Sequence, residues 1–145
     1  MEEQNKTTEE TAKLRQIELF TAGTGGYHTY RIPALIVAPD GTVLAFCEGR
    51  RNSARDDGDI DIVLRRSSDN DTTWEDMEVV FADGEDTIGN PCPVVDRDTD
   101  TIWLPFCRNN DQVYVTKSTD NGANWSTPVE ITKDVKLSSW GWYAT

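Results

Sequence analysis

The sequence predicts an all-β protein that forms about two blades of a β-propeller. Short runs of apolar and β-branched residues alternate with turns rich in Asp, Asn, Gly and Pro, a pattern typical of antiparallel strands. One motif that contains Ser and Asp and closes on Trp occurs twice, beginning at Ser67 and at Ser118. A Trp-bearing repeat of about 50 residues has the length of a propeller blade of four short strands, which favours a propeller over a sandwich.

Composition and charge narrow the possible partners. The 145 residues are enough for one hydrophobic core of ordinary size. A net charge of -12 at pH 7 opposes binding to nucleic acid or to an anionic membrane surface, because both carry dense negative charge. Arginines concentrate between residues 31 and 66, which predicts a local basic patch on an acidic chain. No apolar run approaches the length of a membrane-spanning helix.

The N-terminal residues divide into an arm and a first strand. Residues 1–15 are polar and almost devoid of large apolar side chains, so we expect a flexible arm that is disordered or weakly helical. They lack the apolar stretch of a secretory signal, and the sequence leaves the compartment open. Residues 16–20 alternate and predict a strand, which the glycine-rich residues 21–26 end. Residues 16–145 are therefore assigned to the propeller.

A β-hairpin follows the stretch Tyr-Arg-Ile-Pro at residues 30–33. Apolar residues 34–38 and 42–47 flank Pro39-Asp40-Gly41, which is a turn sequence. Pro33 cannot donate to a strand ladder, so it marks a strand entrance and favours an extended Arg31-Ile32. Arg31 would then lie at the mouth of the strand, where its guanidinium could bind a carboxylate through two hydrogen bonds. The alternative is that Arg31 pairs with a neighbouring Asp and only holds the entrance together.

A polar loop, residues 48–59, leads from this hairpin to a strand at residues 60–66, and the first copy of the Trp motif comes next. In each copy, Ser and Asp side chains can accept hydrogen bonds from turn amides, a left-handed residue closes the turn, and the Trp ring folds onto the blade. The residues that carry these roles are Ser67, Asp69 and Trp74, then Ser118, Asp120, Gly122 and Trp125. A calcium loop would need a Glu where Val80 stands, so no metal is predicted.

Further short strands are expected at residues 78–82, 92–96, 102–107 and 113–117, and no amphipathic helix of ten or more residues is expected outside the N-terminal arm. The three cysteines lie in or beside apolar runs without metal-ligand spacing. We therefore interpret Cys47, Cys92 and Cys107 as small core residues. The single histidine, His28, is assigned a packing or loop role.

These motifs occur in an order that resembles the opening third of bacterial sialidases. The resemblance rests on Tyr-Arg-Ile-Pro, Gly-Arg-Arg-Asn-Ser-x-x-Asp, Ile-Asp-Ile-Val-Leu-Arg-Arg-Ser and the two Trp motifs, which are similar to the sialidase Asp-box. It extends from about residue 19 to residue 145. It implies a six-bladed propeller that hydrolyses terminal α-linked sialic acids on glycoconjugates. Such enzymes need no cofactor and use a tyrosine nucleophile; many are secreted or lie on the cell surface.

The resemblance also implies roles for individual residues. Arg31 corresponds to the first of three arginines that bind the sugar carboxylate, and Asp56 to the general acid/base. Arg50 matches an arginine that reaches the C4 side of the sugar, and Asn90 falls where the family places a residue near the same part. For Asp56, the residues alone favour the other interpretation, a solvated acidic loop paired with Arg50, Arg51 and Arg55. The neighbouring Asp57 and Asp59 would favour the protonated form of Asp56, as a general acid requires.

Two departures from the family limit what this chain should do by itself. A short polar turn at residues 108–112 stands where the family carries a substantial insertion. The resemblance also places the Tyr nucleophile, its Glu and two triad arginines in blades beyond residue 145. We therefore expect the chain to supply Arg31, Arg50 and Asp56 for a sialylated glycan, and to self-associate or join the missing blades. The alternative is a catalytically inactive sialidase-like fragment or a carbohydrate-binding module.

Overall fold

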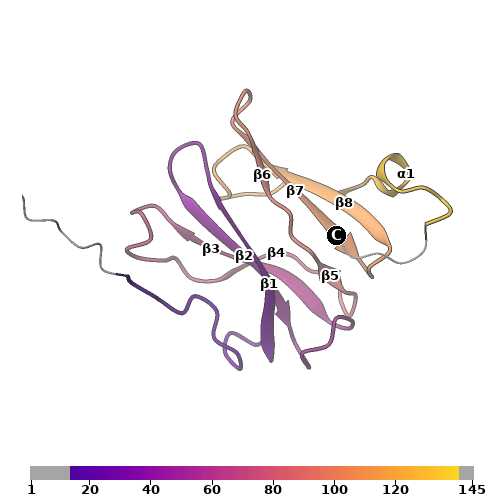
Figure 1. Cartoon of the computed structure of the whole chain (residues 1–145), viewed down its shortest axis with the longest axis horizontal. Coiled ribbons are helices and arrows are strands. Elements are labelled where there is room, and N and C mark those ends of the chain that lie inside the picture. The colour runs from indigo at the N-terminus through magenta and orange to yellow at the C-terminus, as the bar shows by residue number, and fades with distance from the viewer. Residues whose placement is uncertain (1–13, 141–145) are drawn as a thin grey trace, which may run out of the picture.

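The computed structural model describes residues 14–140, and these form two antiparallel sheets that lie side by side (Figure 1). The first sheet has the order β1-β2-β3-β4, with strands Thr29–Val37, Val43–Arg50, Ile60–Ser67 and Glu78–Phe81. The second contains β5 to β9, with strands Ile88–Gly89, Val94–Asp96, Thr101–Arg108, Gln112–Ser118 and Val129–Glu130. A four-residue helix, α1 (Thr132–Val135), follows. The predicted all-β class is confirmed.

The first sheet begins with the predicted hairpin. The turn between β1 and β2 is closed by a hydrogen bond from Ala38 N to Thr42 O at 2.8 Å. The Asp40 carboxylate accepts from Thr42 N at 2.9 Å, and Gly41 has a φ of 92° that glycine adopts at little cost. Local side-chain chemistry therefore determines this turn, which is why the sequence predicts it.

A β-bulge interrupts β1 immediately after Arg31. The register runs through Arg31↔Glu48 and resumes at Ala34↔Phe46, so β1 carries one extra residue. Ile32 has a φ of 55°, and the expectation that Arg31-Ile32 would both be extended is wrong at Ile32. Since Pro33 has no N–H to donate, the strand leaves the ladder there, and the extra residue is accommodated by a left-handed backbone.

The second sheet repeats this bulge. Gly89 pairs with Cys107, and the Cys92 N–H donates to the Pro105 carbonyl at 3.0 Å two positions back along β7. Asn90, with a φ of 56°, precedes Pro91 just as Ile32 precedes Pro33. Here the interruption is longer and divides the inner strand into β5 and β6, both of which pair with β7. The two sheets are therefore structural repeats and form consecutive propeller blades.

The two Asp-boxes occupy equivalent positions, between β3 and β4 and between β8 and β9. In the second box, Ser118 Oγ accepts from Gly122 N at 2.9 Å, and Asp120 Oδ1 accepts from Asn124 N at 2.9 Å. The first box has the same bonds through Ser67, Asp69, Asp71 and Thr73, at 3.0 and 2.8 Å. The predicted placement of Trp74 and Trp125 in corresponding turns of consecutive antiparallel units is therefore confirmed.

Gly122 offers a sharp test of the second box. Gly122 has a φ of 81°, and a Cβ built there would overlap Cδ2 of the buried Leu44. We expect Gly122→Ala to destabilise the chain by about 2–4 kcal/mol, through left-handed strain and overpacking. Gly41→Ala is the control, because Gly41 has a similar φ of 92° but nothing within 4 Å of the added atom. It should lose only about 1–2 kcal/mol. Equal shifts of the urea midpoint would contradict the Leu44 contact.

The acid sensitivity of the boxes follows from their hydrogen bonds. The side-chain and backbone N–H groups of Asn124, with Ser118, lower the pKa of Asp120, and Thr73 and Ser67 lower the pKa of Asp69. A lowered folded-state pKa gives stability that is present above the unfolded value of about 3.9 and is lost as the pH falls through the folded value. We expect the urea concentration at the unfolding midpoint to decrease as the pH is lowered below about 4. The fall should be smaller in Asp120→Asn, and an unchanged midpoint at pH 3 would contradict this.

The hydrophobic core lies between the two blades. The first blade contributes Leu44, Phe46, Ile62 and Leu64, and the second contributes Ile88, Ile102, Leu104 and Phe106, all at most 1% exposed. The Trp125 ring packs edge-on against Phe46 with centroids 5.8 Å apart. Burial on this scale favours a fixed arrangement of the two sheets, so loops at their shared end can form one site.

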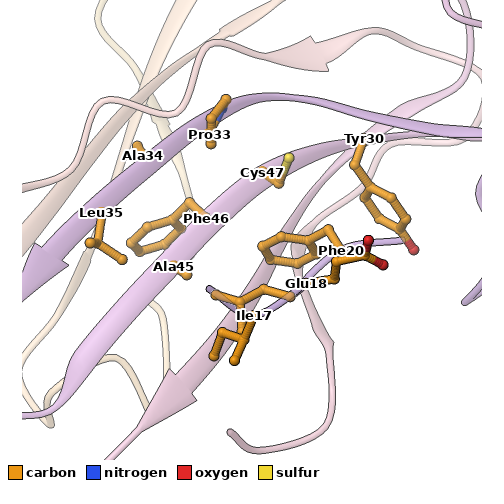
Figure 2. A pocket seen from close by; sticks show the side chains of 11 residues that line it. Ile17, Glu18, Phe20, Tyr30, Pro33, Ala34, Leu35, Ala45, Phe46 and Cys47 are labelled. Carbon is orange, nitrogen blue, oxygen red and sulfur yellow. The ribbon is translucent and has the colours of Figure 1, made fainter. Parts of the chain in front are cut away.

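The opposite face of the first blade is apolar and only partly covered, with Cys47 and Val63 buried in a second, smaller cluster. Leu35 is 65% exposed there, beside a hollow of about 570 Å³ that β1, β2 and residues 17–20 line. Figure 2 shows Ile17 and Phe20 facing the side chains of both strands. The strand predicted at residues 16–20 is absent, because this segment crosses the face without a hydrogen-bonding partner strand. Its apolar side chains pack instead, with Phe20 and Tyr30 centroids 5.4 Å apart.

Several smaller differences complete the comparison with the sequence. The short strands β5 and β9 and the helix α1 were not predicted, because two to four residues show no periodicity. The strand expected from residue 92 begins at Val94. Most of the arm predicted at residues 1–15 lies outside the described residues. Within residues 14–140, no helix is long and apolar enough to cross a membrane.

Candidate active site

The loops of both blades meet at the end of the sheets opposite the Asp-boxes. At this end, Arg50 of β2 pairs with Ile60 of β3, and Arg108 of β7 with Gln112 of β8. At the other end, β3 and β8 finish at Ser67 and Ser118, the first residues of the boxes. The loop from β2 to β3 (residues 51–59) therefore lies at the same end as β5 and the β7–β8 turn.

The structure brings Arg31, Arg50 and Asp56 together at this end. Oδ1 of Asp56 lies 3.0 Å from Nη1 of Arg31 and 2.8 Å from Nη1 of Arg50. The Asp56 side chain is 71% exposed, whereas that of Arg50 is only 3% exposed. Arg31 was expected to have its guanidinium available for a ligand; in this structure it binds Asp56, which is the alternative that the sequence left open. Two guanidinium groups therefore meet at a single accessible carboxylate.

Glu48, which the sequence analysis missed, binds the guanidinium of Arg50. Its Oε2 lies 2.6 Å from Nη2 and 3.0 Å from Nε of Arg50, and both residues are buried. Nη1 of Arg50 donates to the carbonyls of Ala54 and Arg55 at 2.8 and 2.7 Å. Burial alone would lower the pKa of Arg50, but the bonds to Glu48 and Asp56 outweigh it and raise the pKa. Arg50 is a permanent, fixed cation.

Asn90 joins the site through its backbone. The Asn90 N–H donates to Oε1 of Glu48 at 2.9 Å, so one buried carboxylate binds Arg50 with one oxygen and the second blade with the other. A Cβ on Gly89 would lie 2.5 Å from Oε1 of Glu48, and a larger residue than glycine would therefore displace that carboxylate. Asn90, at the bulge described above, therefore contributes its backbone N–H to the site as a donor to Glu48.

The charges around Asp56 differ from the expectation. Asp57 lies 2.8 Å from Arg55, and Asp59 lies 3.1 Å from Arg51, so each neighbour is paired with its own arginine. The expectation drawn from like charges did not include these two arginines, which place a cation beside each neighbouring carboxylate.

A second buried network supports the first residues of the loop. Tyr27 donates to Oδ2 of Asp61 at 2.6 Å, and Nη2 of Arg51 lies 2.6 Å from the same oxygen. The Arg51 guanidinium also lies 4.8 Å from the centre of the Tyr27 ring. Burial raises the pKa of Tyr27, and the hydrogen bond to Asp61 reinforces the shift. Tyr27 is therefore a neutral hydrogen-bond donor that positions Asp61 beneath Arg51.

The remaining reactive side chains do not point to other chemistry. Cys47 and Cys107 are buried as expected, but Cys92 is exposed, because the interruption between β5 and β6 turns it out of the core. Burial raises the pKa of Cys47 to about 11, so it is a thiol rather than a nucleophilic thiolate at neutral pH. Among residues 14–140, no three His, Cys, Asp or Glu side chains are grouped as metal ligands.

Comparison with known proteins gives a consistent result. Residues 29–145 match the model of the BNR repeat-like domain. The chain is 34% identical to an exo-alpha-sialidase of Aspergillus fumigatus, over 82% of this chain and 37% of that protein. It is 31% identical to a sialidase of Bacteroides fragilis, over 82% of this chain and 27% of that protein. The chain therefore spans about a third of the length of these curated relatives.

Solved structures show the same similarity. The Hadza microbial sialidase Hz136 matches with a TM-score of 0.75 and 32% identity, over 82% of this chain and 29% of that one. A Trypanosoma rangeli sialidase in complex with sialic acid matches with a TM-score of 0.62 over 76% of this chain and 21% of that one. At 15% identity the second match supports the fold alone.

Proposed function

The chain belongs to the sialidase family of BNR-repeat proteins, and on that premise we propose that it forms part of the active site of an exo-α-sialidase. The reaction is hydrolysis of terminal α-linked sialic acids on glycoconjugates. The proposal rests on one observation: Oδ1 of Asp56 lies within 3.0 Å of a guanidinium nitrogen of Arg31 and of Arg50, at the loop end of the blades. These are the three residues to which the sequence resemblance assigns substrate binding and acid/base catalysis.

In the proposed reaction, the carboxylate of the sugar binds Arg31 and replaces the Asp56 carboxylate there. The exposed Arg31 suits this exchange, because a guanidinium can bind a carboxylate through two parallel hydrogen bonds. Asp56, once released and protonated, would donate its proton to the glycosidic oxygen of the leaving group. Arg50 would contact the sugar from its fixed, buried position, and Asn90 would line the same side. The nucleophile that the resemblance implies is not assigned to any residue of this chain.

The exposed Arg31 also explains how an acidic chain can bind an acidic sugar. The net charge is -12, which repels anions at long range. Charges farther away than a Debye length of about 8 Å are largely screened at physiological salt, whereas a sugar carboxylate that replaces Asp56 would contact Arg31 directly. The net charge should therefore slow association more than it weakens the bound state.

A chimera tests the proposed function. Residues 16–140 would replace the matched segment of Hz136, the solved sialidase at 32% identity. We expect hydrolysis of a fluorogenic sialoside by the chimera, and loss of that activity in its Arg31→Met form. A folded chimera that binds sialic acid without turnover would instead favour a carbohydrate-binding module. That second candidate has its own support, because Asp56 here is an ion-pair partner rather than a proton donor.

We further propose that the isolated 145-residue chain associates through its exposed sheet faces. Apolar side chains project from the outer faces of both blades, including Leu35 and Val37 on the first and Val94 and Val129 on the second. Exposed sheet faces of this kind are usually covered by another blade. Light scattering should detect species larger than a monomer, and fewer of them in Leu35→Glu. Leu14→Glu is the control, since Leu14 is 84% exposed outside the sheets. A monomeric wild-type chain would contradict association.

A further inference from the structure

The loop that carries Asp56 is held by the second blade as well as by its own. Thr87, directly before β5, makes two hydrogen bonds to Gly58: Gly58 N donates to Thr87 Oγ1, and Thr87 Oγ1 donates to the Gly58 carbonyl, both at 2.9 Å. One hydroxyl can make both bonds at once, because it has one hydrogen and two acceptor lone pairs. Thr87 is only 5% exposed, so water does not readily substitute for it.

Gly58 is the point at which the loop turns. Its φ of 108° lies in a region that side chains other than glycine rarely adopt, and it stands two residues after Asp56 in the sequence. The hydroxyl of Thr87 therefore binds the one residue of this loop that has a positive φ. A shift of Gly58 would move Asp56 relative to Arg31 and Arg50.

Thr87 is itself fixed by the turn between β7 and β8. Its N–H donates to Oδ1 of Asn109 at 2.9 Å, and its carbonyl accepts from the N–H of Asn109 at 2.8 Å. Nδ2 of Asn110 donates to the Asp56 carbonyl at 3.0 Å. A continuous set of hydrogen bonds thus runs from the second blade to both Gly58 and Asp56.

The first blade holds different parts of the same loop. Arg50 donates to the carbonyls of Ala54 and Arg55, and the Arg51 N–H donates to the Asp59 carbonyl at 3.0 Å. These bonds fix the residues before Asp56 and the closing residue of the loop. Thr87 and Asn110 act from the other side of Asp56, so the position of its carboxylate depends on the docking of two blades.

We infer that Thr87 is a positioning residue for Asp56: by binding both backbone groups of Gly58, it sets where the carboxylate lies relative to the two arginines. The catalytic consequence rests on the proposed function, whereas the restraint on the loop does not. Thr87 acts from the second blade on a residue of the first. Loosening the contact between the blades would therefore remove the bonds of Thr87 and Asn110 to the loop and leave only those of the first blade.

Hydrogen exchange on the full chain tests the restraint. In Thr87→Val, which removes the hydroxyl and nearly preserves the shape, we expect about tenfold faster amide exchange in peptides covering residues 56–59, the effect of losing a buried hydrogen-bond partner. Thr87→Ser should restore slow exchange. The control is Thr116→Val: Thr116 is as buried, and its hydroxyl donates to the Ser126 carbonyl at 2.6 Å. It should leave residues 56–59 unchanged, and unchanged exchange in Thr87→Val would overturn the inference.

The chimera with Hz136 tests the consequence for catalysis. Thr87→Val should lower kcat about 10- to 100-fold for alkyl sialosides with little change in KM, since misplacement of a catalytic group affects the transition state most. Activated aryl sialosides should lose less, and Thr87→Ser should recover both. Equal losses on both substrates, or no loss, would overturn the positioning role even if exchange is faster. An inactive chimera with Thr87 intact would count against the proposed function alone, because the exchange result stands without it.

Discussion

Asp56→Asn in the active chimera is expected to lower kcat for alkyl sialosides by about 10²–10⁴-fold, the usual contribution of general acid catalysis. An alkyl leaving group must be protonated as the glycosidic bond breaks, and the amide of Asn is too weak an acid to transfer a proton. Sialosides with an activated aryl leaving group should lose far less, because the phenolate departs without protonation. Steady-state kinetics on one substrate of each kind measure the difference.

The neighbouring aspartate provides the control for this experiment. Asp57 belongs to the same loop, is similarly exposed, and pairs with Arg55 rather than with the central arginines. Asp57→Asn should therefore leave both substrates within a few-fold of the starting activity, about the scatter expected for an exposed ion pair. If Asp56→Asn depressed both substrates equally, the carboxylate would be organising Arg31 and Arg50 instead of donating a proton.

The parts of the fold that the sequence predicts are those determined by neighbours along the chain. The turn at residues 39–41 and both Asp-boxes depend on side chains that bind backbone groups two to four residues away. Such contacts leave a local signature of Asp, Ser and Gly. Runs of apolar and β-branched residues between turn sequences were also enough to predict β2, β3, β7 and β8 within a few residues.

The features that were missed depend on distant partners. The positive φ of Ile32 is a property of the ladder with β2, and Ile is among the residues least expected there. Glu48 lies in a strand of apolar residues and binds the backbone of Asn90, 42 positions further on. No pattern around residue 48 could predict that contact. The sequence analysis assigned residue 48 to a polar loop, where a charged side chain needs no buried partner, whereas β2 continues to Arg50.

The candidate site follows the same division. The resemblance supplied Arg31, Arg50 and Asp56, and the structure brings them together. The local environment of Asp56 was not predictable, because it depends on which arginine pairs with which aspartate in a loop that contains several of both. Arg51 pairs with Asp59, and Arg55 pairs with Asp57. Asp56 pairs with Arg31 and Arg50.

Glu48→Ala should destabilise the chain by about 3 kcal/mol or more, which would be a large fraction of the stability of a small domain. Removing the carboxylate leaves the buried Arg50 guanidinium without the partner of its Nε and Nη2 groups, and the Asn90 N–H loses its acceptor. Burying a cation with unsatisfied donors is costly, because water cannot replace the lost partner. The remaining bond between Arg50 and Asp56 keeps the expected loss at the lower end of the range for broken buried pairs.

Two variants separate this burial effect from the loss of any ion pair. Glu75→Ala also removes a carboxylate from an arginine, Arg66, at 2.7 Å, but the side chain of Glu75 is 47% exposed. Its loss should cost less than about 1 kcal/mol. Glu48→Gln retains an acceptor oxygen and the shape, and should lie between the two. Urea unfolding of the three variants measures the order. If Glu48→Ala cost no more than Glu75→Ala, Arg50 would have to regain water or another partner, and the buried carboxylate would not be what fixes it beneath Asp56.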